Sequence, residues 1–229
     1  EIRSHVQDRP LSETGLRAAP CFGWLAAHHD PGHFVWAVDD PDLVARAHGQ
    51  LTRLVGRMLG DRLEALYDAM AGRGRFSPDA KSAGRRALRN AALTVLAARG
   101  TAEDRTRTAA HYFKAQNMTE QAHGLALLAR TETPDRQKAL DHFFERWKED
   151  HLVIDTWFAV QAQSPLKRAL TDVEALTRHP AFSLKTPNKV RALIGNFAMQ
   201  NPQQFNRADG RGYTFVADQV LAIDRLNPQ

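Results

Sequence analysis

The sequence predicts an all-α protein, built as a superhelix of antiparallel helix pairs like that of HEAT or armadillo repeats. Apolar residues recur at three- and four-residue spacing along most of the chain, while no run alternates convincingly at a period of two. Cap-like side chains and prolines recur at short intervals, which indicates short helices joined by tight turns. Consecutive helices of this kind stack as antiparallel pairs, and a row of pairs gives a right-handed superhelix.

The composition is that of a chain that folds. Hydrophobic residues make up 43% of the 229 residues, which is enough for a sizeable core. No window approaches the roughly 18 uninterrupted apolar residues that a membrane span requires, and no signal pattern follows Glu1. The single cysteine, Cys21, excludes an internal disulfide and a cysteine-rich metal site. We therefore expect a cytoplasmic protein with no membrane partner.

Two parts of the chain differ in character. Residues 1–38 contain three prolines and three glycines without a sustained helical period, so we expect an irregular segment there. Residues 39–229 are expected to form one α-helical superhelical domain. His28, His29 and His33 lie in the irregular segment, where Pro31 and the following glycine break any helix that could align two of them on a metal. Loop histidines are the expected interpretation.

The first helix is expected between residues 40 and 70, with a bend near Gly60. Gly72, Gly74 and the Ser77-Pro78 pair end it. Its apolar positions fall on one helical stripe: Leu43, Ala47, Leu51, Leu54, Val55, Met58, Leu59, Leu63, Leu66, Tyr67 and Met70.

A second helix is expected from Asp79 to the helix-ending Gly100. Its small apolar positions permit close packing: Ala83, Ala87, Leu88, Ala91, Ala92, Val95 and Leu96. Arg85, Arg86 and Arg89 lie on the other side and are expected to form a solvated face. Thr101 then opens the next helix as its N-cap, with two acidic residues in the positive first turn.

The same punctuation repeats toward the C-terminus. Four cap-like residues stand directly before a proline, where the missing N–H costs a helix nothing, and four helix starts are expected there: Thr133-Pro134, Ser164-Pro165, Thr186-Pro187 and Asn201-Pro202. The helices between them should be about 10 to 16 residues long. A glycine turn at residues 209–213 leads into a last helix through Phe215 and Ile223.

The segment 152–165 is the least polar part of the chain. Val153, Trp157 and Val160 recur at helical spacing, with Ile154 and Phe158 offset by one residue. A helix of this pattern is apolar around most of its girth, which is typical of an interior helix. We expect the rest of the domain to pack around it.

The charge leaves an alternative open. A net charge of +5 and a pI near 9.7 are compatible with an anionic partner. The 31 basic residues are interleaved with 26 acidic ones, and no nucleic-acid module accompanies them, so nucleic acid is not the expected partner. A freestanding helical-repeat binding module, with Arg85, Arg86 and Arg89 converging on a concave face, remains the alternative function.

Catalytic motifs are missing from the sequence. It contains no His-Glu-x-x-His, no Gly-x-Ser-x-Gly and no phosphate-binding loop, so we predict no catalytic residue and no metal site. His142, Glu145 and Glu149 share a helical face and His151 follows them, but they alternate with aromatic residues and are expected to be the wet side of an amphipathic helix. A third possibility is an enzyme whose site is assembled from scattered residues.

Several segments resemble, in order and spacing, the C-terminal helical domain of bacterial aminopeptidase N, of the M1 family of zinc metallopeptidases. The resemblance covers residues 60–229, and these stretches carry it: residues 86–93, 115–119, 155–162 with Ser164-Pro165, 187–197, Asn201-Pro202, Phe205, Asp209-Gly210, 212–215 and Asn227-Pro228-Gln229. Each is a weak signal alone, but the ordered series is specific.

The resemblance implies a function. Enzymes of the family remove N-terminal residues from peptides with one zinc ion, held by a His-Glu-x-x-His motif in a catalytic domain that this chain lacks. Their C-terminal domain is a superhelical bowl that acts as lid and substrate filter over the active site. This chain is therefore expected to be inactive alone, to hold no cofactor, and to partner the catalytic domain of the same polypeptide and, in the whole enzyme, peptide substrates.

Two positions match family residues that face the chamber, Arg191 and Gln229. A guanidinium at residue 191 would present paired donors to a substrate carboxylate or backbone carbonyl, a geometry that arginine suits better than lysine. The structural alternative is a surface arginine on the helix after Thr186-Pro187. The family continues through further helices beyond Asn-Pro-Gln, so the domain is expected to be cut short at its C-terminal end.

Overall fold

The computed structural model describes residues 40–72 and 75–226, and in these ranges it contains helices and no strand. The all-α prediction is confirmed. The expected irregular segment 1–38, its histidines, Cys21 and Gln229 lie outside the described residues, so the boundary near residue 38 stays a prediction. The first half of the chain forms α5 (Pro41–Met58), α6 (Gly60–Ala69), α7 (Ala80–Arg99), α8 (Ala102–Phe113), α9 (Met118–Leu128) and α10 (Pro134–Trp147).

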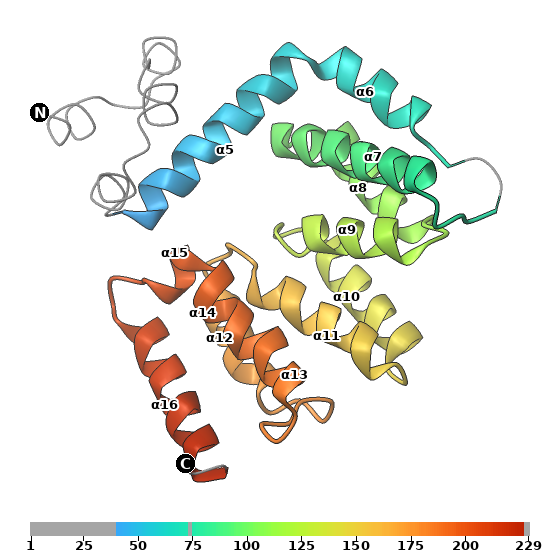
Figure 1. The fold of residues 1–229 in the computed structure, drawn as a ribbon. Coiled ribbons are helices and arrows are strands. Elements are labelled where there is room, and N and C mark those ends of the chain that lie inside the picture. Colours follow the sequence, from blue (N-terminus) through green and yellow to red (C-terminus); the bar gives the residue numbers. More distant parts are fainter. Residues whose placement is uncertain (1–39, 73–74, 227–229) are drawn as a thin grey trace, which may run out of the picture.

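The second half contains shorter elements and one π-helix. They are α11 (His151–Ala162), α12 (Ala169–Leu176), α13 (Pro187–Val190), the π-helix η1 (Arg191–Gly195), α14 (Asn196–Gln200), α15 (Pro202–Phe205) and α16 (Arg211–Leu226). The helices are therefore 4 to 20 residues long, a wider range than expected. Figure 1 shows them stacked in succession along a curved array, which confirms the superhelix of helix pairs.

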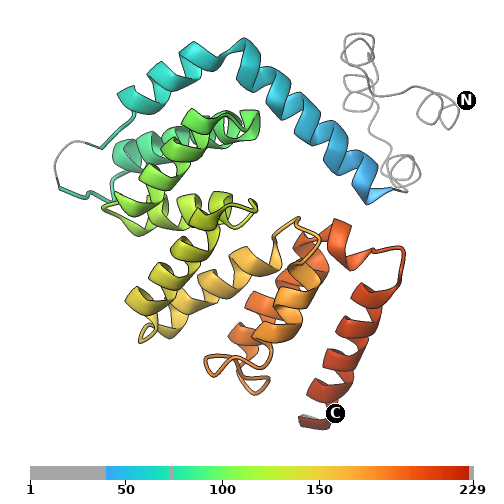
Figure 2. The ribbon, with the colours of Figure 1, turned by 180° about the vertical axis from the view of Figure 1, so that it is seen from behind.

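The first expected helix is two helices that meet at Leu59. The predicted bend near Gly60 is thus confirmed as a complete break. From there α5 extends back to the other end of the array, as both views show (Figures 1 and 2). Near its start, Gln203 Nε2 donates to Asp42 Oδ1 at 2.9 Å, which joins α5 to α15. Part of its predicted apolar stripe faces outward, since Leu51 and Met58 are exposed.

α11 is the interior helix that the sequence predicts. Ile154, Trp157 and Phe158 are buried among residues of α9, α10 and α12, in one apolar cluster that extends from α8 to α16. Trp157 Nε1 donates to the Leu140 carbonyl at 3.0 Å, so its polar atom is satisfied inside the core. A smaller cluster joins α6 to α7 around Tyr67.

Polar side chains satisfy the buried end of α11. Asn201 Nδ2 donates to the Ala162 carbonyl at 2.8 Å and to the Ser164 carbonyl at 2.7 Å, and Asn201 is 2% exposed. Ser164 Oγ donates to the Ala129 carbonyl at 2.8 Å, at the end of α9. The last carbonyls of a helix have no partner within it. These contacts satisfy them and tie α9, α11 and α15 together.

Three of the four expected cap-proline starts begin a helix, and one does not. Ser164-Pro165 is wrong as a helix start, because the buried Ser164 side chain reaches back to α9 and α12 begins only at Ala169. Thr133 and Thr186 precede helices that begin with proline, but their side chains make no capping bond. Asn201 caps as predicted, and so does Thr101, which accepts from the Asp104 N–H at 3.1 Å.

The arginines of α7 do not form a solvated face, and that prediction is wrong. Arg85 donates to the Ala69 carbonyl at 2.6 Å and Arg86 to the Ser77 carbonyl at 2.9 Å, so both fasten the segment between α6 and α7. Arg89 pairs with Glu120 of α9 at 2.7 Å. The buried side of α7 is also rotated from the expected one, since Leu88 is exposed while Leu93 is fully buried.

A buried ion-pair network joins α6, α7 and α8. Arg99 binds the fully buried carboxylate of Asp104 through two nitrogens, each at 2.7 Å, and Glu64 at 2.6 Å. Arg107 contacts both acids as well. Burial alone would raise the pKa of Asp104, but the hydrogen bonds from Arg99 and Thr101 outweigh it, and the pKa is lowered.

His111 lies in a second buried polar network. Its Nε2 lies 3.1 Å from Asn90 Oδ1, and its Nδ1 lies 2.9 Å from the Tyr67 hydroxyl. Because Asn90 Nδ2 donates to the Thr119 carbonyl, Asn90 Oδ1 is an acceptor, so His111 carries its proton on Nε2. Burial lowers the pKa of His111 to about 4, and the positive charge of Arg89 adds to the effect. The imidazole is therefore neutral in the folded protein at pH 7.

We expect Asn201→Ala to lower the free energy of unfolding by about 2–4 kcal/mol, since it removes the partners of two buried carbonyls and a helix cap. Chemical denaturation measures the difference. Asn206→Ala is the matched control, because Asn206 is exposed and both of its hydrogen bonds lie at the surface, one donated to the Pro202 carbonyl and one accepted from the Tyr213 hydroxyl. This control should lower the free energy of unfolding by less than about 1 kcal/mol. Equal losses for the two variants would contradict the role of Asn201.

His111 should make the stability depend on pH. The unfolded chain binds a proton near the ordinary pKa of 6.5, and the folded chain only near pH 4. Its contribution is complete above pH 6.5 and falls, by up to about 3 kcal/mol, as the pH drops toward 4. Denaturation curves recorded at several pH values between 4 and 7 give the free energy of unfolding at each pH. For His111→Gln, which keeps an N–H donor, this free energy should therefore change less steeply with pH than for the wild type. Identical slopes would contradict this account. Arg89, Glu120 and His123 face the ring, so they stay unchanged in both proteins.

Candidate functional site

Arg191 lies at the start of the π-helix. Thr186-Pro187 begins α13, and the chain widens into η1 four residues later. Asn196 stabilises this wider turn, since its Nδ2 donates to the Arg191 and Ala192 carbonyls, each at 3.1 Å. Gln163 Nε2 in turn donates to Asn196 Oδ1 at 2.5 Å. Single π turns of this kind are frequent at functional sites, because they shift the side chains on either side of them.

The side chains of η1 divide into a buried and an exposed group. Ala192, Leu193 and Ile194 are buried in the core that surrounds α11. Arg191 is exposed, and its Nη1 donates to Asn188 Oδ1 at 3.0 Å. The described part of the chain provides no acidic partner for Arg191. One side of the guanidinium is thus held by a neutral amide, and the rest of it is available to a carboxylate or a carbonyl.

The neighbouring lysine shows the opposite arrangement. Lys189 is 5% exposed, and its Nζ lies 2.7 Å from Asp155 Oδ1 and from the His151 carbonyl. Lys189 therefore joins α13 to the first turn of α11 and is not available to a ligand. Of the two cations in this helix turn, only Arg191 is exposed.

Of the two predicted chamber residues, Arg191 is exposed and Gln229 lies outside the described residues. The sequence did not predict the two asparagines that hydrogen-bond to Arg191, which are Asn188 and Asn196. Their sequence signal is weak, because an asparagine three residues before an arginine or five after it is common on any helix surface.

The histidines and acids near α10 do not assemble a site. His142 contacts the Tyr112 hydroxyl at 2.9 Å, and Glu145 pairs with Lys148 at the surface. His142 and Glu145 are exposed on α10, as expected of its polar side, whereas Glu149 and His151 are exposed but lie beyond the end of this helix. Within residues 40–72 and 75–226, no three His, Cys, Asp or Glu side chains come together where a metal ion could bind. The same part of the chain contains no helix long and apolar enough to cross a membrane.

Among the described residues, the geometry needed for the two alternative functions, a freestanding binding module and an enzyme with a site assembled from scattered residues, is not found. Arg85, Arg86 and Arg89 are bound to backbone carbonyls and to Glu120, so they do not converge on a binding face. His111, whose pKa is strongly lowered, has polar partners on both ring nitrogens. It lies in the packed interior, away from the pocket between α10 and α12. Its pKa reflects burial in a structural network and does not mark a catalytic cleft.

The comparisons with known proteins agree with this fold. Residues 31–229 match the family described as domain of unknown function (DUF3458_C), ARM repeats. Aminopeptidase N of Caulobacter vibrioides is 42% identical over 189 residues, which are 82% of this chain and 22% of that protein. Aminopeptidase N of Escherichia coli is 33% identical over 190 residues, 83% of this chain and 22% of that protein.

A solved structure supports the same relationship. The crystal structure of Legionella pneumophila aminopeptidase A in complex with aspartic acid matches with a TM-score of 0.75 and 27% sequence identity, over 82% of this chain and 23% of that one. The chain spans about a fifth of the length of the relatives that it matches. The match is to one domain of these longer polypeptides and not to a standalone repeat protein. The chain therefore belongs to the DUF3458_C family of ARM-repeat domains, and it matches the C-terminal helical domain of the M1 aminopeptidases.

Proposed function

We propose that this chain serves as lid and substrate filter in a zinc-dependent aminopeptidase N that removes N-terminal residues from peptides. The similarity to aminopeptidase N over 82% of the chain carries the proposal. The ARM-repeat architecture supports it, since stacked helix pairs form extended curved surfaces that suit the wall of a chamber. The cytoplasm is the compartment that we propose, in keeping with a sequence whose only cysteine is Cys21.

The zinc ion of such an enzyme would be held outside this chain. A catalytic zinc needs three protein ligands around an open position, and the described residues offer no group of three His, Cys, Asp or Glu. The partner of this domain would be the catalytic domain of the same polypeptide. The chain itself would shape the space around the substrate and select among peptides by their length and charge.

Arg191 is the residue that we propose for contact with the peptide. It is exposed, has a neutral partner in Asn188, and has no acid to neutralise it among the described residues. A guanidinium in this state binds a carboxylate with charge-assisted hydrogen bonds. Arg191 would thus bind the C-terminal end or a backbone carbonyl of a short peptide. Gln229 remains the second proposed chamber residue, as part of the family pattern Asn-Pro-Gln at residues 227–229.

The purified chain should not hydrolyse aminoacyl chromogenic substrates, even with added zinc. The sequence contains no His-Glu-x-x-His motif, and the described residues offer no group of three His, Cys, Asp or Glu that could hold a zinc ion instead. A full-length aminopeptidase N, assayed in parallel, is the positive control. Turnover by the chain alone at a comparable rate would contradict the proposal.

Arg191→Ala, made in the enzyme that contains this chain, should raise the KM for tripeptides about tenfold while kcat changes little. The reason is the loss of a charge-assisted hydrogen bond made equally in the ground and transition states. An aminoacyl chromogenic amide without a free carboxylate should be hydrolysed as by the wild type. Asn188→Ala should give a smaller increase in KM, since it only releases the guanidinium.

The matched control is Arg178→Ala. Arg178 is exposed and lies just after α12, and the variant should leave both kinetic parameters unchanged. A tripeptide KM that is unaltered by Arg191→Ala would remove Arg191 from the proposed site. The claim that the chain is inactive alone would still be tested separately, by the assay of the purified chain.

A further inference from the structure

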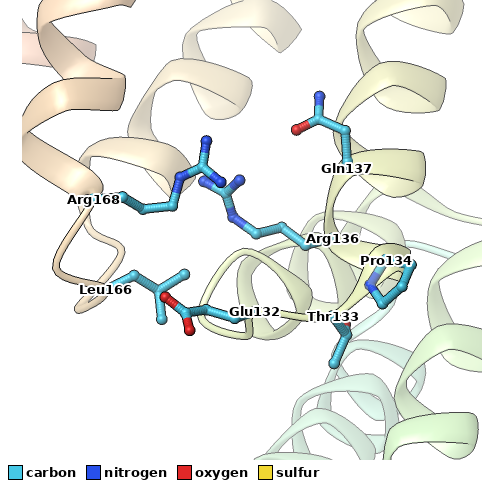
Figure 3. Close-up of a pocket in the computed structure, with 7 residues that line it drawn as sticks. All are labelled: Glu132, Thr133, Pro134, Arg136, Gln137, Leu166 and Arg168. Carbon is cyan, nitrogen blue, oxygen red and sulfur yellow. The ribbon is translucent and has the colours of Figure 1, made fainter.

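A polar pocket lies between the start of α10 and the loop that leads into α12. Its volume is about 300 Å3, at the small end of the range for ligand sites. Figure 3 shows Arg136 of α10 and Arg168, the residue just before α12, pointing toward each other, with Glu132 on another side. Pro134 and Leu166 add apolar surface. The pocket does not include Arg191, so the inference from it does not rest on the proposed function.

The two arginines are only partly neutralised. Both pair with one carboxylate, since Arg136 Nη2 lies 2.8 Å and Arg168 Nε 3.0 Å from Asp172 Oδ2. Arg136 is 5% exposed, and its Nε also donates to the Ala129 carbonyl at 3.4 Å. Within the described ranges, Nη1 of Arg136 and both Nη atoms of Arg168 have no partner. These N–H groups are free to donate to an oxygen-bearing ligand.

The third charged group of the wall is an acid. Glu132 is exposed and makes no hydrogen bond or ion pair with any residue that the structure describes. It is nonetheless close enough to act on Arg168, whose pKa is raised first by its hydrogen bonds to Asp172 and to a lesser degree by the charge of Glu132. Cation and anion thus face each other across the pocket without contact.

The balance of charges decides which ligand fits. Two guanidiniums and two carboxylates sum to zero, so a phosphate or another plain anion would meet the repulsion of Glu132. A molecule with a carboxylate at one end and an ammonium at the other satisfies both walls and adds no net charge. The apolar surfaces of Pro134 and Leu166 can then contact an aliphatic side chain.

We propose that this pocket binds a free α-amino acid with an aliphatic side chain. The two free Nη atoms of Arg168 would bind the α-carboxylate in the fork geometry that guanidinium groups favour for carboxylates, and the free Nη1 of Arg136 would add one further hydrogen bond. Glu132 would bind the α-ammonium group. The pocket opens at the N-terminal end of α10, whose 14 residues give that end a positive field that also favours the carboxylate.

A titration of the 229-residue chain with L-leucine, followed by NMR, tests this proposal. We expect saturable shifts of the Arg168 Nε–H signal and of the backbone amides of residues 132–137. N-acetyl-L-leucine lacks the ammonium group and L-leucinamide lacks the carboxylate, so each should bind at least about tenfold more weakly. Absence of saturable shifts up to the solubility limit of leucine would overturn the proposal. Equal shifts with inorganic phosphate would overturn it too, by showing a plain anion site.

Variants assign the roles of the two walls. Arg168→Gln and Glu132→Gln should each weaken leucine binding about tenfold, since each removes one charged partner of the ligand. Arg178→Gln and Glu149→Gln, which change exposed residues outside the pocket, are the matched controls and should bind as the wild type does. The NMR spectrum of each variant reports whether it is folded. Wild-type affinity in both pocket variants would contradict the proposed site.

Discussion

The buried C-terminal end of α11 is the constraint on which the rest of the array depends. A helix at the centre of a core must find partners for its last carbonyls, and an unpaired buried carbonyl costs about 1–3 kcal/mol. Asn201 supplies two donors to this end, and Ser164 extends the link to α9. At the other end of α11, Lys189 binds the His151 carbonyl and Asp155. Successive helix pairs are therefore joined by specific polar contacts as well as by apolar packing.

The same use of polar groups explains the basic composition. Arg89, Arg99 and Arg136 each bind a carboxylate that lies wholly or largely inside the structure, and Arg85 binds a backbone carbonyl. These arginines hold helices together, so their share of the basic charge is not available to a binding face. Arg191 differs from them because its partner is neutral and it remains exposed. This difference separates a candidate ligand-binding arginine from the structural ones.

The sequence predicted what local physics decides. Three predictions that depend only on neighbouring residues are confirmed. They are the apolar surface of α11, the helix end and start at Gly100 and Thr101, and the cap at Asn201. The partners of Ser164 and of the α7 arginines are 9 to 35 residues away, so their spacing alone could not reveal them. The π turn depends on Asn196 and Gln163, a contact between separate helices. The pocket of Arg136 and Arg168 likewise forms only when α10 meets α12.

Hydrogen exchange of backbone amides in the native state tests the central role of α11 most directly. If the buried C-terminal end of this helix organises the array, the amides of residues 154–162 should exchange only through global unfolding, with the highest protection among the described residues. The amides of α5 and α16, which bury few of their residues, should exchange through smaller openings at lower free energy. Protection of α11 no greater than that of α5 would contradict the account.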